Sequence, residues 1–351
     1  MNLKKNRGVP RREADIDPTS LNVLLVIFAA IILMLIILAS YFAITLTAQE
    51  EPPSTEKETT DTSLPDEEAT YPFRVNDIII EVPDTDDAKN IIAKDFMNSE
   101  KAILIDLTTN EIVASRQAGQ VMYPASMTKV MTLIVVAENL KNESALNDVL
   151  TVNVPIGEHS GFGFSIGDTL TVKDLIYAAI LQSDGVACIM LANYIAGSET
   201  NFVKLMNEKA REMGLDEKTT LFQNCTGLHE QYHYSTCRDM AIIMAYAMKN
   251  PFCASVLTTL KYSPSGNFRP GNTYTFWNGF LHNRLSDGNK QPKNAEIIGG
   301  KTGWTGKDSG YCIVSYVKGN NGHFYVSVTS KAESWDANVQ DIINIFNEYV
   351  K

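Results

Sequence analysis

The chain has 351 residues, and its 30 Lys and Arg residues against 41 Asp and Glu residues give a formal net charge of −11. A net acidic chain lacks the basic surface typical of nucleic-acid-binding proteins, so we expect no nucleic-acid partner. Hydrophobic residues make up 44% of the chain and charged residues 20%, which is close to the globular average and excludes disorder for most of the chain. The length allows one large domain or two ordinary ones.

The N-terminal part has the pattern of a membrane anchor. Residues 1–20 carry five basic and three acidic side chains, residues 21–48 carry no charge, and residues 23–39 form an unbroken apolar run. A helix of this length can cross a bilayer. Because the basic residues precede the run, the positive-inside tendency predicts a cytoplasmic leader (1–20), one transmembrane helix (21–47) and an extracytoplasmic remainder attached to the cell membrane.

A cleaved signal peptide is the alternative interpretation. It is disfavoured because the apolar run is about twice the usual length and the pair Leu46 and Ala48 is a poor cleavage site. Residues 48–72 are rich in acidic side chains and contain Pro52, Pro53 and Pro65, which predicts a disordered, extended stalk. Residues 73–351 would then form the functional domain.

Strands are predicted at both ends of this domain. Residues 102–107 and 111–115 alternate between apolar and polar side chains and predict a hairpin. Residues 297–302, 310–318 and 323–330 read as three more strands. Apolar residues then repeat at helical spacing from Trp335 to Val350, which predicts a closing amphipathic helix that packs on the sheet.

Helices are predicted between the two groups of strands. Apolar residues recur at three- and four-residue steps in residues 126–140, 172–182, 187–195, 200–213 and 236–248. Thr236 has the character of an N-cap, with Asp239 three positions on. The order of strands, helices and strands predicts an α/β fold of the α+β type, in which the last strands join the first pair in one sheet.

The first motif with chemical potential is Ser126-Met127-Thr128-Lys129. A helix that begins at Ser126 places the serine hydroxyl and the Lys129 amine on one face, one turn apart. A neutral amine can then accept the hydroxyl proton, and partial burial and a second nearby cation would favour the neutral form. The helix N-terminus adds backbone donors where negative charge develops.

Two more motifs follow in the order expected of an active-site serine enzyme. Ser183-Asp184-Gly185 comes after a predicted helix, and Lys301-Thr302-Gly303 lies on a predicted strand. In such an enzyme Ser183 relays protons, Lys301 holds positive charge, and Thr302 with the strand edge binds the anionic end of a substrate.

Together these segments resemble the D-alanyl-D-alanine carboxypeptidase family of low-molecular-mass penicillin-binding proteins. The likeness extends from about residue 98 to about residue 332, and it is carried by four stretches: PASMTKVMT (124–132), NCTGLH (224–229), HYST (233–236) and GKTGWT (300–305).

The resemblance implies a serine transpeptidase or β-lactamase-like fold, with an antiparallel sheet flanked by helices and a helical subdomain. It implies that Ser126 is the acylated nucleophile, Lys129 its general base, Ser183 the proton relay and Lys301 the charge partner. Thr302, Gly303 and Trp304 would bind substrate, with the N–H groups of Ser126 and Trp304 as oxyanion hole. The substrate would be the D-Ala-D-Ala end of a peptidoglycan stem peptide, β-lactams would inhibit, and no cofactor is expected.

Two departures from the family pattern accompany this resemblance. The family usually has Asn at the third position of the second motif, where this chain has Gly185, so a side-chain amide for a substrate carbonyl is missing. The chain also ends at Lys351, soon after the sheet, without the extra β domain and C-terminal anchor of many members. The N-terminal helix would then provide the anchor.

Other patterns have competing readings. His229-Glu230-Gln231-Tyr232-His233 matches a zinc-protease motif, but Gly227 before it and the cap at Thr236 after it favour a loop. The stretch ESALN (143–147) resembles the deacylation motif of class A β-lactamases, but it precedes the second motif instead of following it, which favours a surface helix end. A β-lactamase and a penicillin-binding sensor with little turnover remain the alternative functions. Buried free thiols are the favoured interpretation of the five widely spaced cysteines, a disulfide is the alternative that spacing cannot assign, and no CxxC pair indicates zinc.

Overall fold

A five-stranded antiparallel sheet brings the two ends of the domain together in the order β2-β1-β9-β8-β7. The computed structural model describes residues 71–75, 80, 88–155, 163–268, 274–285 and 290–351. The strands are β1 (Lys101–Asp106), β2 (Glu111–Arg116), β7 (Ala295–Gly303), β8 (Tyr311–Gly319) and β9 (Phe324–Ala332). All five predicted strands are confirmed, and β9 pairs with β1, as the predicted single sheet requires.

Alternation along the central strands divides the domain into two apolar cores. In β1, Ile103 and Ile105 pack into the core of the helical block, whereas Ala102 and Leu104 pack into the second core on the other face. Successive side chains of a strand point to opposite faces, so a strand buried on both sides needs apolar residues at every position. Every residue of β1 is buried accordingly.

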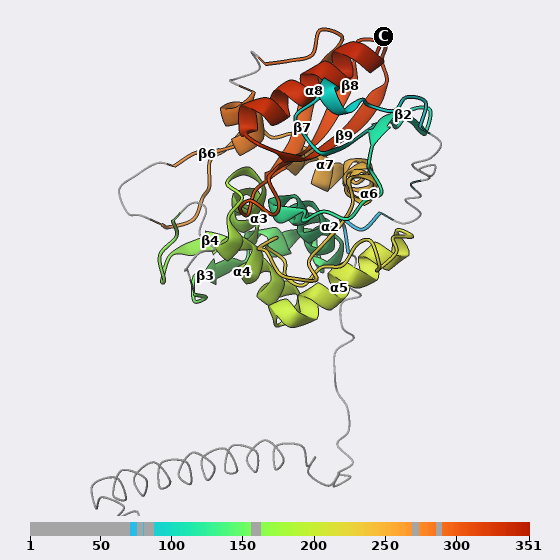
Figure 1. Ribbon diagram of the computed structural model, residues 1–351. Helices are drawn as coiled ribbons and strands as arrows, with labels where there is room; N and C mark the ends of the chain where they lie inside the picture. The colour runs from blue at the N-terminus through green and yellow to red at the C-terminus, as the bar shows by residue number, and fades with distance from the viewer. Residues whose placement is uncertain (1–70, 76–79, 81–87, 156–162, 269–273, 286–289) are drawn as a thin grey trace, which may run out of the picture. The chain divides into compact units, whose positions relative to one another are not determined.

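The C-terminal helix α8 (Trp335–Tyr349) covers one face of the sheet, as Figure 1 shows. Its buried positions Val339, Ile342 and Phe346 recur at three- and four-residue spacing and pack against Leu104 of β1 and neighbouring strands. The predicted amphipathic helix is therefore confirmed, with its apolar face in the core.

The helical block lies on the opposite face of the sheet (Figure 1). It contains α2 (Lys129–Asn139), α3 (Val172–Leu181), α4 (Gly185–Ala196), α5 (Glu199–Glu212), α6 (Cys237–Lys249) and α7 (Pro251–Leu257). The first five match the predicted helices to within a few residues, and α7 was not predicted.

A buried polar contact joins three of these helices. Glu138 of α2 is fully buried; Tyr246 of α6 donates a hydrogen bond to its Oε1 over 2.7 Å, and the Lys209 amine of α5 lies 2.7 Å from Oε2. A buried carboxylate is tolerated only with such partners. This contact holds α2, which begins at Lys129 of the first motif, against α5 and α6.

Several short elements complete the domain. They are η2 (Lys94–Phe96), η3 (Ala125–Thr128), η4 (Glu143–Asn147), the π-helix η6 (Gly279–Arg284), the strand pair β3 (Val149–Thr151) and β4 (Thr169–Thr171), and the pair β5 (Lys261–Tyr262) and β6 (Phe276–Trp277). The η4 segment is the mostly exposed helical turn that was expected at residues 143–147.

All five cysteines are buried and free, which agrees with the favoured of the two interpretations of the sequence. Burial raises the pKa of the Cys188 thiol to about 11, which keeps it protonated at neutral pH. The predicted leader, anchor and most of the stalk lie outside the described residues. Among the described residues, no single helix has the length and apolar character for a membrane span, although the sharply bent pair α6 and α7 meets the criterion jointly.

The cap of α6 gives a test of the fold. Thr236 Oγ1 accepts a hydrogen bond of 2.9 Å from the backbone N–H of Asp239, as the sequence predicted. We expect Thr236→Ala to lower the free energy of unfolding by about 1 kcal/mol, because a helical N–H loses its partner. Urea unfolding measures this change. The matched control is Thr236→Ser, which keeps the hydroxyl; equal losses in both variants would show that the methyl packing, not the cap, matters.

Candidate active site

Ser126 lies on a 3₁₀ turn, not on an α-helix. The sequence predicted an α-helix from residue 126, but η3 spans Ala125–Thr128 and α2 begins only at Lys129. In a 3₁₀ turn, residues three apart are eclipsed, so the Lys129 side chain stands directly over Ser126. The Lys129 amine donates a hydrogen bond of 3.0 Å to Ser126 Oγ. The tighter turn therefore aligns the predicted pair.

A loop behind this turn gives Lys129 its second partner. The Lys129 amine donates to the Thr226 carbonyl over 2.5 Å, and only 3% of the lysine is exposed. Asn224 Oδ1 accepts hydrogen bonds from the backbone N–H groups of Thr226 and Gly227, at 3.2 and 2.8 Å, and so fixes the loop. The family resemblance included this loop, but sequence reasoning assigned it no role. Its role here is to orient the lysine.

Gly227 is required by the close approach of this loop to the serine turn. Its φ of 82° is in the left-handed region, and an added Cβ would lie 2.0 Å from the Ala125 carbonyl oxygen. No side chain can occupy that space.

The second predicted pair also forms. The Lys301 amine of β7 donates hydrogen bonds of 2.9 Å to Ser183 Oγ and of 2.9 Å to the Thr302 carbonyl. Ser183 lies in the turn between α3 and α4 with a φ of 57°, an uncommon value for a residue with a side chain. Asp184 then caps α4 by accepting from the N–H of Ala187 over 2.8 Å.

The close approach of β7 to the serine turn joins the two pairs in one site. An added Cβ at Gly303 would lie 2.7 Å from the Pro124 carbonyl oxygen and 3.2 Å from the Met127 nitrogen. The backbone of Trp304 follows directly, beside the turn that holds Ser126. The Trp304 side chain is 52% exposed and stacks on Tyr311 with ring centroids 6.0 Å apart.

The electrostatics of the site disfavour two charged lysines. Burial lowers the pKa of Lys301 well below its ordinary value, and the positive charge of Lys129 lowers it further. The readily neutral amine is therefore that of Lys301, which is hydrogen-bonded to the Ser183 hydroxyl. A neutral amine next to a serine hydroxyl is what proton abstraction from that hydroxyl requires.

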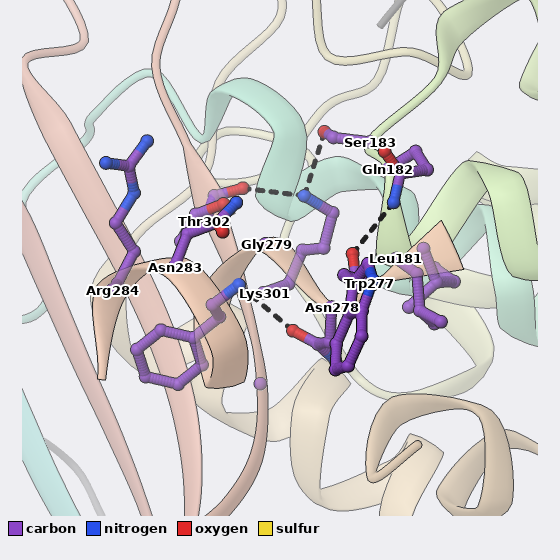
Figure 2. A pocket seen from close by; sticks show the side chains of 13 residues that line it. Leu181, Gln182, Ser183, Trp277, Asn278, Gly279, Asn283, Arg284, Lys301 and Thr302 are labelled. Atoms are coloured by element: carbon purple, nitrogen blue, oxygen red, sulfur yellow. Dashed lines mark hydrogen bonds between the residues drawn. The ribbon is translucent and has the colours of Figure 1, made fainter. Parts of the chain in front are cut away.

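A pocket of about 270 Å³ opens beside the second pair, as Figure 2 shows. Its walls are Ser183 with the end of α3, the β7 residues Gly300 to Thr302, and a segment from Trp277 to Arg284 that contains η6. Gln182 closes one side by donating a 2.8 Å hydrogen bond to the Trp277 carbonyl. The wall from Trp277 to Arg284 carries no sequence motif and was not predicted.

Gly185 is the buried first residue of α4 and has no side chain to offer to a substrate. Glycine in place of the family's usual asparagine therefore removes one side-chain hydrogen bond to a substrate carbonyl. The turn itself is intact, because Ser183 and the Asp184 cap keep their contacts.

The segment that matches the zinc motif forms a loop, as expected. His233 Nδ1 accepts a 3.1 Å hydrogen bond from the N–H of Gln223, so Nε2 carries the hydrogen and donates to Thr128 Oγ1 over 2.8 Å. Burial, helped by the charge of Lys129, lowers the pKa of His233 to about 4 and keeps it neutral. Both ring nitrogens are thus occupied, and the described residues contain no cluster of three or more side chains suited to a metal ion.

Comparison with known proteins gives the family. A model of the D-alanyl-D-alanine carboxypeptidase family matches residues 88–333. The chain belongs to this family. It is 31% identical over 227 residues to the D-alanyl-D-alanine carboxypeptidase DacF of Bacillus subtilis, a match that covers 64% of this chain and 55% of the relative. The chain thus spans about half the length of that relative.

Solved structures with the same fold extend the comparison. The DD-transpeptidase of Streptomyces K15 superposes with a TM-score of 0.62 at 25% identity, covering 73% of this chain and 98% of that chain. Penicillin-binding protein 5 of Haemophilus influenzae gives a TM-score of 0.61 at 25% identity, covering 71% and 70%. These likenesses bear out the serine peptidase fold, with its antiparallel sheet and helices, that the sequence resemblance implied.

The close approach at Gly227 can be tested directly. We expect Gly227→Ala to lower the free energy of unfolding by about 2 kcal/mol or more and to slow acylation of Ser126, because the new methyl group must push the serine turn away from Lys129. Thermal unfolding and covalent labelling by fluorescent penicillin measure the two effects. Gly214→Ala is the matched control, since it has a similar φ but nothing within 4 Å of its added Cβ. Equal effects in both variants would attribute the result to backbone strain alone.

The missing amide at Gly185 gives a second test. A lost hydrogen bond to a substrate carbonyl costs on the order of 1 kcal/mol. We expect Gly185→Asn to raise kcat/KM for a D-Ala-D-Ala peptide by about tenfold. The assay is D-alanine release, with circular dichroism to confirm folding. A fall in activity of a folded variant would mean that another group already serves this carbonyl.

Proposed function

We propose that the protein is a membrane-anchored, serine-type D-Ala-D-Ala carboxypeptidase that removes the terminal D-alanine from peptidoglycan stem peptides through an acyl-serine intermediate. The observation that carries the proposal is the pair of serine–lysine contacts, Lys129 with Ser126 and Lys301 with Ser183, in one buried site. Family membership supports the reaction class, and the names of the relatives support the substrate.

The first half of the reaction acylates Ser126. A neutral lysine amine accepts the hydroxyl proton, and Ser126 Oγ forms a bond to the carbonyl carbon of the penultimate D-alanine. The negative charge that develops on the carbonyl oxygen would be stabilised by the backbone N–H groups of Ser126 and Trp304. Ser126 lies on the turn that Gly303 of β7 approaches, and Trp304 is the residue after Gly303.

The second half releases both products. The C–N bond breaks as Ser183, hydrogen-bonded to Lys301, passes its hydroxyl proton to the leaving amine of D-alanine and regains the proton that the lysine took from Ser126, so that the lysine is neutral again. Water then attacks the acyl-serine ester, the lysine accepts a proton from this water, and Ser126 regains its hydroxyl hydrogen as the shortened peptide leaves. A β-lactam amide would acylate Ser126 by the same first step, which makes β-lactams the expected inhibitors.

The anchor belongs to the same proposal. The charge-free residues 21–47 and the basic residues before them support a single-pass helix with the catalytic domain outside the cell membrane. The acidic stalk at residues 48–72 would let the domain, from residue 73 onward, reach substrate at a distance from the bilayer.

Two other functions use the same acylation step. A β-lactamase needs a group that activates the deacylating water, and the one candidate motif that the sequence suggested lies in η4, on the surface. A penicillin-binding sensor with little turnover has Gly185 as its support. Release of D-alanine from a stem-peptide analogue, compared with hydrolysis of penicillin, separates the three functions.

The mechanism is tested by covalent labelling. We expect fluorescent penicillin to attach to Ser126 in the wild type and in no other position, and Ser126→Ala to abolish labelling without loss of folding. Lys129→Arg should slow acylation by several orders of magnitude, because a guanidinium does not deprotonate. Mass spectrometry of the labelled peptide identifies the site. Labelling that survives in Ser126→Ala would remove the acyl-serine mechanism.

The topology has its own test. An uncleaved anchor should keep the purified protein in the membrane fraction, with its original N-terminus or the residue after the initiator methionine. N-terminal sequencing and fractionation measure this. A mature chain that begins near Gln49 would instead support the signal-peptide alternative.

A further inference from the structure

A long hollow crosses one end of the five-stranded sheet. Because the sheet is antiparallel, the ends of β7, β9 and β2 and the starts of β8 and β1 lie at the same end. Two cavities, of about 420 and about 880 Å³, open there, and Glu100 lines both of them. They therefore adjoin, and we call them together the sheet-end groove. It extends from Trp304, after β7, to Gln120, after β2.

One end of the sheet-end groove lies beside the candidate active site. Trp304 lines the groove, and the backbone N–H of the same residue belongs to the proposed oxyanion hole. The exposed Trp304 ring stacks on Tyr311, which also lines the groove. Aromatic faces offer apolar contact area to a passing chain. The acyl part of a substrate bonded to Ser126 can therefore continue into the groove.

The sheet-end groove is basic, although the protein is acidic. Acidic residues outnumber basic ones by 41 to 30 in the chain, whereas the groove has more basic than acidic side chains. Its charged residues are Lys94, Arg116, Lys307 and Lys331 on the basic side, with Glu100 and Glu333 on the acidic side. The carboxylate of Glu100 lies 3.1 Å from the Lys331 amine, which pairs these two charges.

Three of the cations in the groove have no such partner. Lys94, Arg116 and Lys307 form no ion pair with any residue that the structure describes. The Arg116 guanidinium donates only to backbone carbonyls, those of Lys94 and Met97, at 3.1 and 3.5 Å. A groove with unpaired positive charge attracts an anionic partner.

Backbone strain marks two of the residues that line the groove. Gln117 and Lys331 have left-handed φ values of 48° and 63°, which are uncommon for residues with a side chain. Lys331 lies where the register of β8 against β9 shifts, as in a β-bulge. Bulges redirect side chains, and strain of this kind clusters at functional sites. The groove thus combines strained backbone with unpaired charge.

The length of the groove favours a polymer as its occupant. Five adjacent strands about 4.8 Å apart span roughly 19 Å, which an extended peptide covers with about six residues. The acyl part of a stem peptide is shorter than this, so the far half of the groove would hold the sugar chain that carries the stem. Gln117 and Gln120 are exposed there and offer amide groups to sugar hydroxyls.

We propose that the sheet-end groove binds the polymeric strand of peptidoglycan. The acyl part of the stem peptide passes Trp304 and Tyr311, and the carboxylates of the strand and its neighbouring stems pair with Lys94 and Arg116. This inference rests on the proposed carboxypeptidase function and names the form of the substrate. The enzyme trims stems that are attached to a strand in preference to free peptides, because only the strand reaches the far half of the groove.

The kinetic test compares two substrates with the full-length protein in detergent. One is the peptide diacetyl-L-lysyl-D-Ala-D-Ala, and the other is an uncross-linked glycan strand whose stems end in D-Ala-D-Ala. We expect the wild type to have the higher kcat/KM per stem for the strand. The double variant Lys94→Glu, Arg116→Gln should lower kcat/KM for the strand by about tenfold and change that for the peptide by less than about twofold.

The matched control is the double variant Lys204→Glu, Arg211→Gln. It changes the net charge equally through two exposed residues of α5, so both substrates should be cleaved at wild-type rates. The single variant Lys94→Glu alters one exposed side chain and should lower kcat/KM for the strand by about threefold, which keeps the test valid if loss of the Arg116 contacts disturbs folding. The inference is overturned if the groove variants leave the strand unaffected, lower both substrates equally, or act no more strongly than the control.

A binding measurement separates this inference from the proposed function. Insoluble peptidoglycan is sedimented with each protein in the presence of excess benzylpenicillin, which occupies the site at Ser126. We expect the Kd of the groove double variant to exceed that of the wild type and of the control by about tenfold. This result supports the groove even if no D-alanine is released, in which case only the carboxypeptidase proposal fails. Equal sedimentation of all three proteins would contradict the groove, whatever the turnover.

Discussion

The burial of two lysine amines within one site is the constraint on which the rest of this structure depends. Lys129 and Lys301 are each at most 3% exposed, and each amine has one serine hydroxyl and one backbone carbonyl as partners. Burying two positive charges costs free energy, and this cost falls when one of the two amines becomes neutral. In this site the amine with the lowered pKa is that of Lys301.

The fold supplies this arrangement by bringing three backbones unusually close together. The loop at Gly227 and the end of β7 at Gly303 both press on the turn that holds Ser126, and neither position has room for a Cβ atom. Two residues of the site have strained backbone conformations, since Ala125 and Ser183 have left-handed φ values of 48° and 57°. Such strain persists only where the surrounding structure enforces it, and at Ala125 the loop at Gly227 and the end of β7 pack directly against the turn.

The layers of the fold could be predicted from the sequence because their signals are long. The strands from β7 to β9 and the helix α8 repeat their apolar residues over many positions, and each was found within a few residues of its place. Elements of two to seven residues, such as β5, β6 and α7, are too short to show a period. The helix start at Ser126 was wrong because hydrophobic spacing does not distinguish an α-helix from one 3₁₀ turn at its N-terminus.

The site itself was predictable only where a motif marks it. The contact of Ser183 with Lys301 joins residues 118 positions apart, and the order of the motifs with the family resemblance, not periodic spacing, brought them into one hypothesis. The segment from Trp277 to Arg284 belongs to no motif and contains a π-helix without a periodic signal, so its place in the pocket wall emerges only in three dimensions.

The pH dependence of acylation tests the central claim, that two buried lysines share one site and one of them is readily neutral. The second-order rate of penicillin acylation is measured by stopped flow over the pH range in which the protein stays folded. The account predicts a rate that rises with pH, as the site loses the proton of a buried amine, and that levels off well below the ordinary lysine pKa of about 10.4. A rate that is independent of pH, or that rises only through that ordinary value, would contradict it.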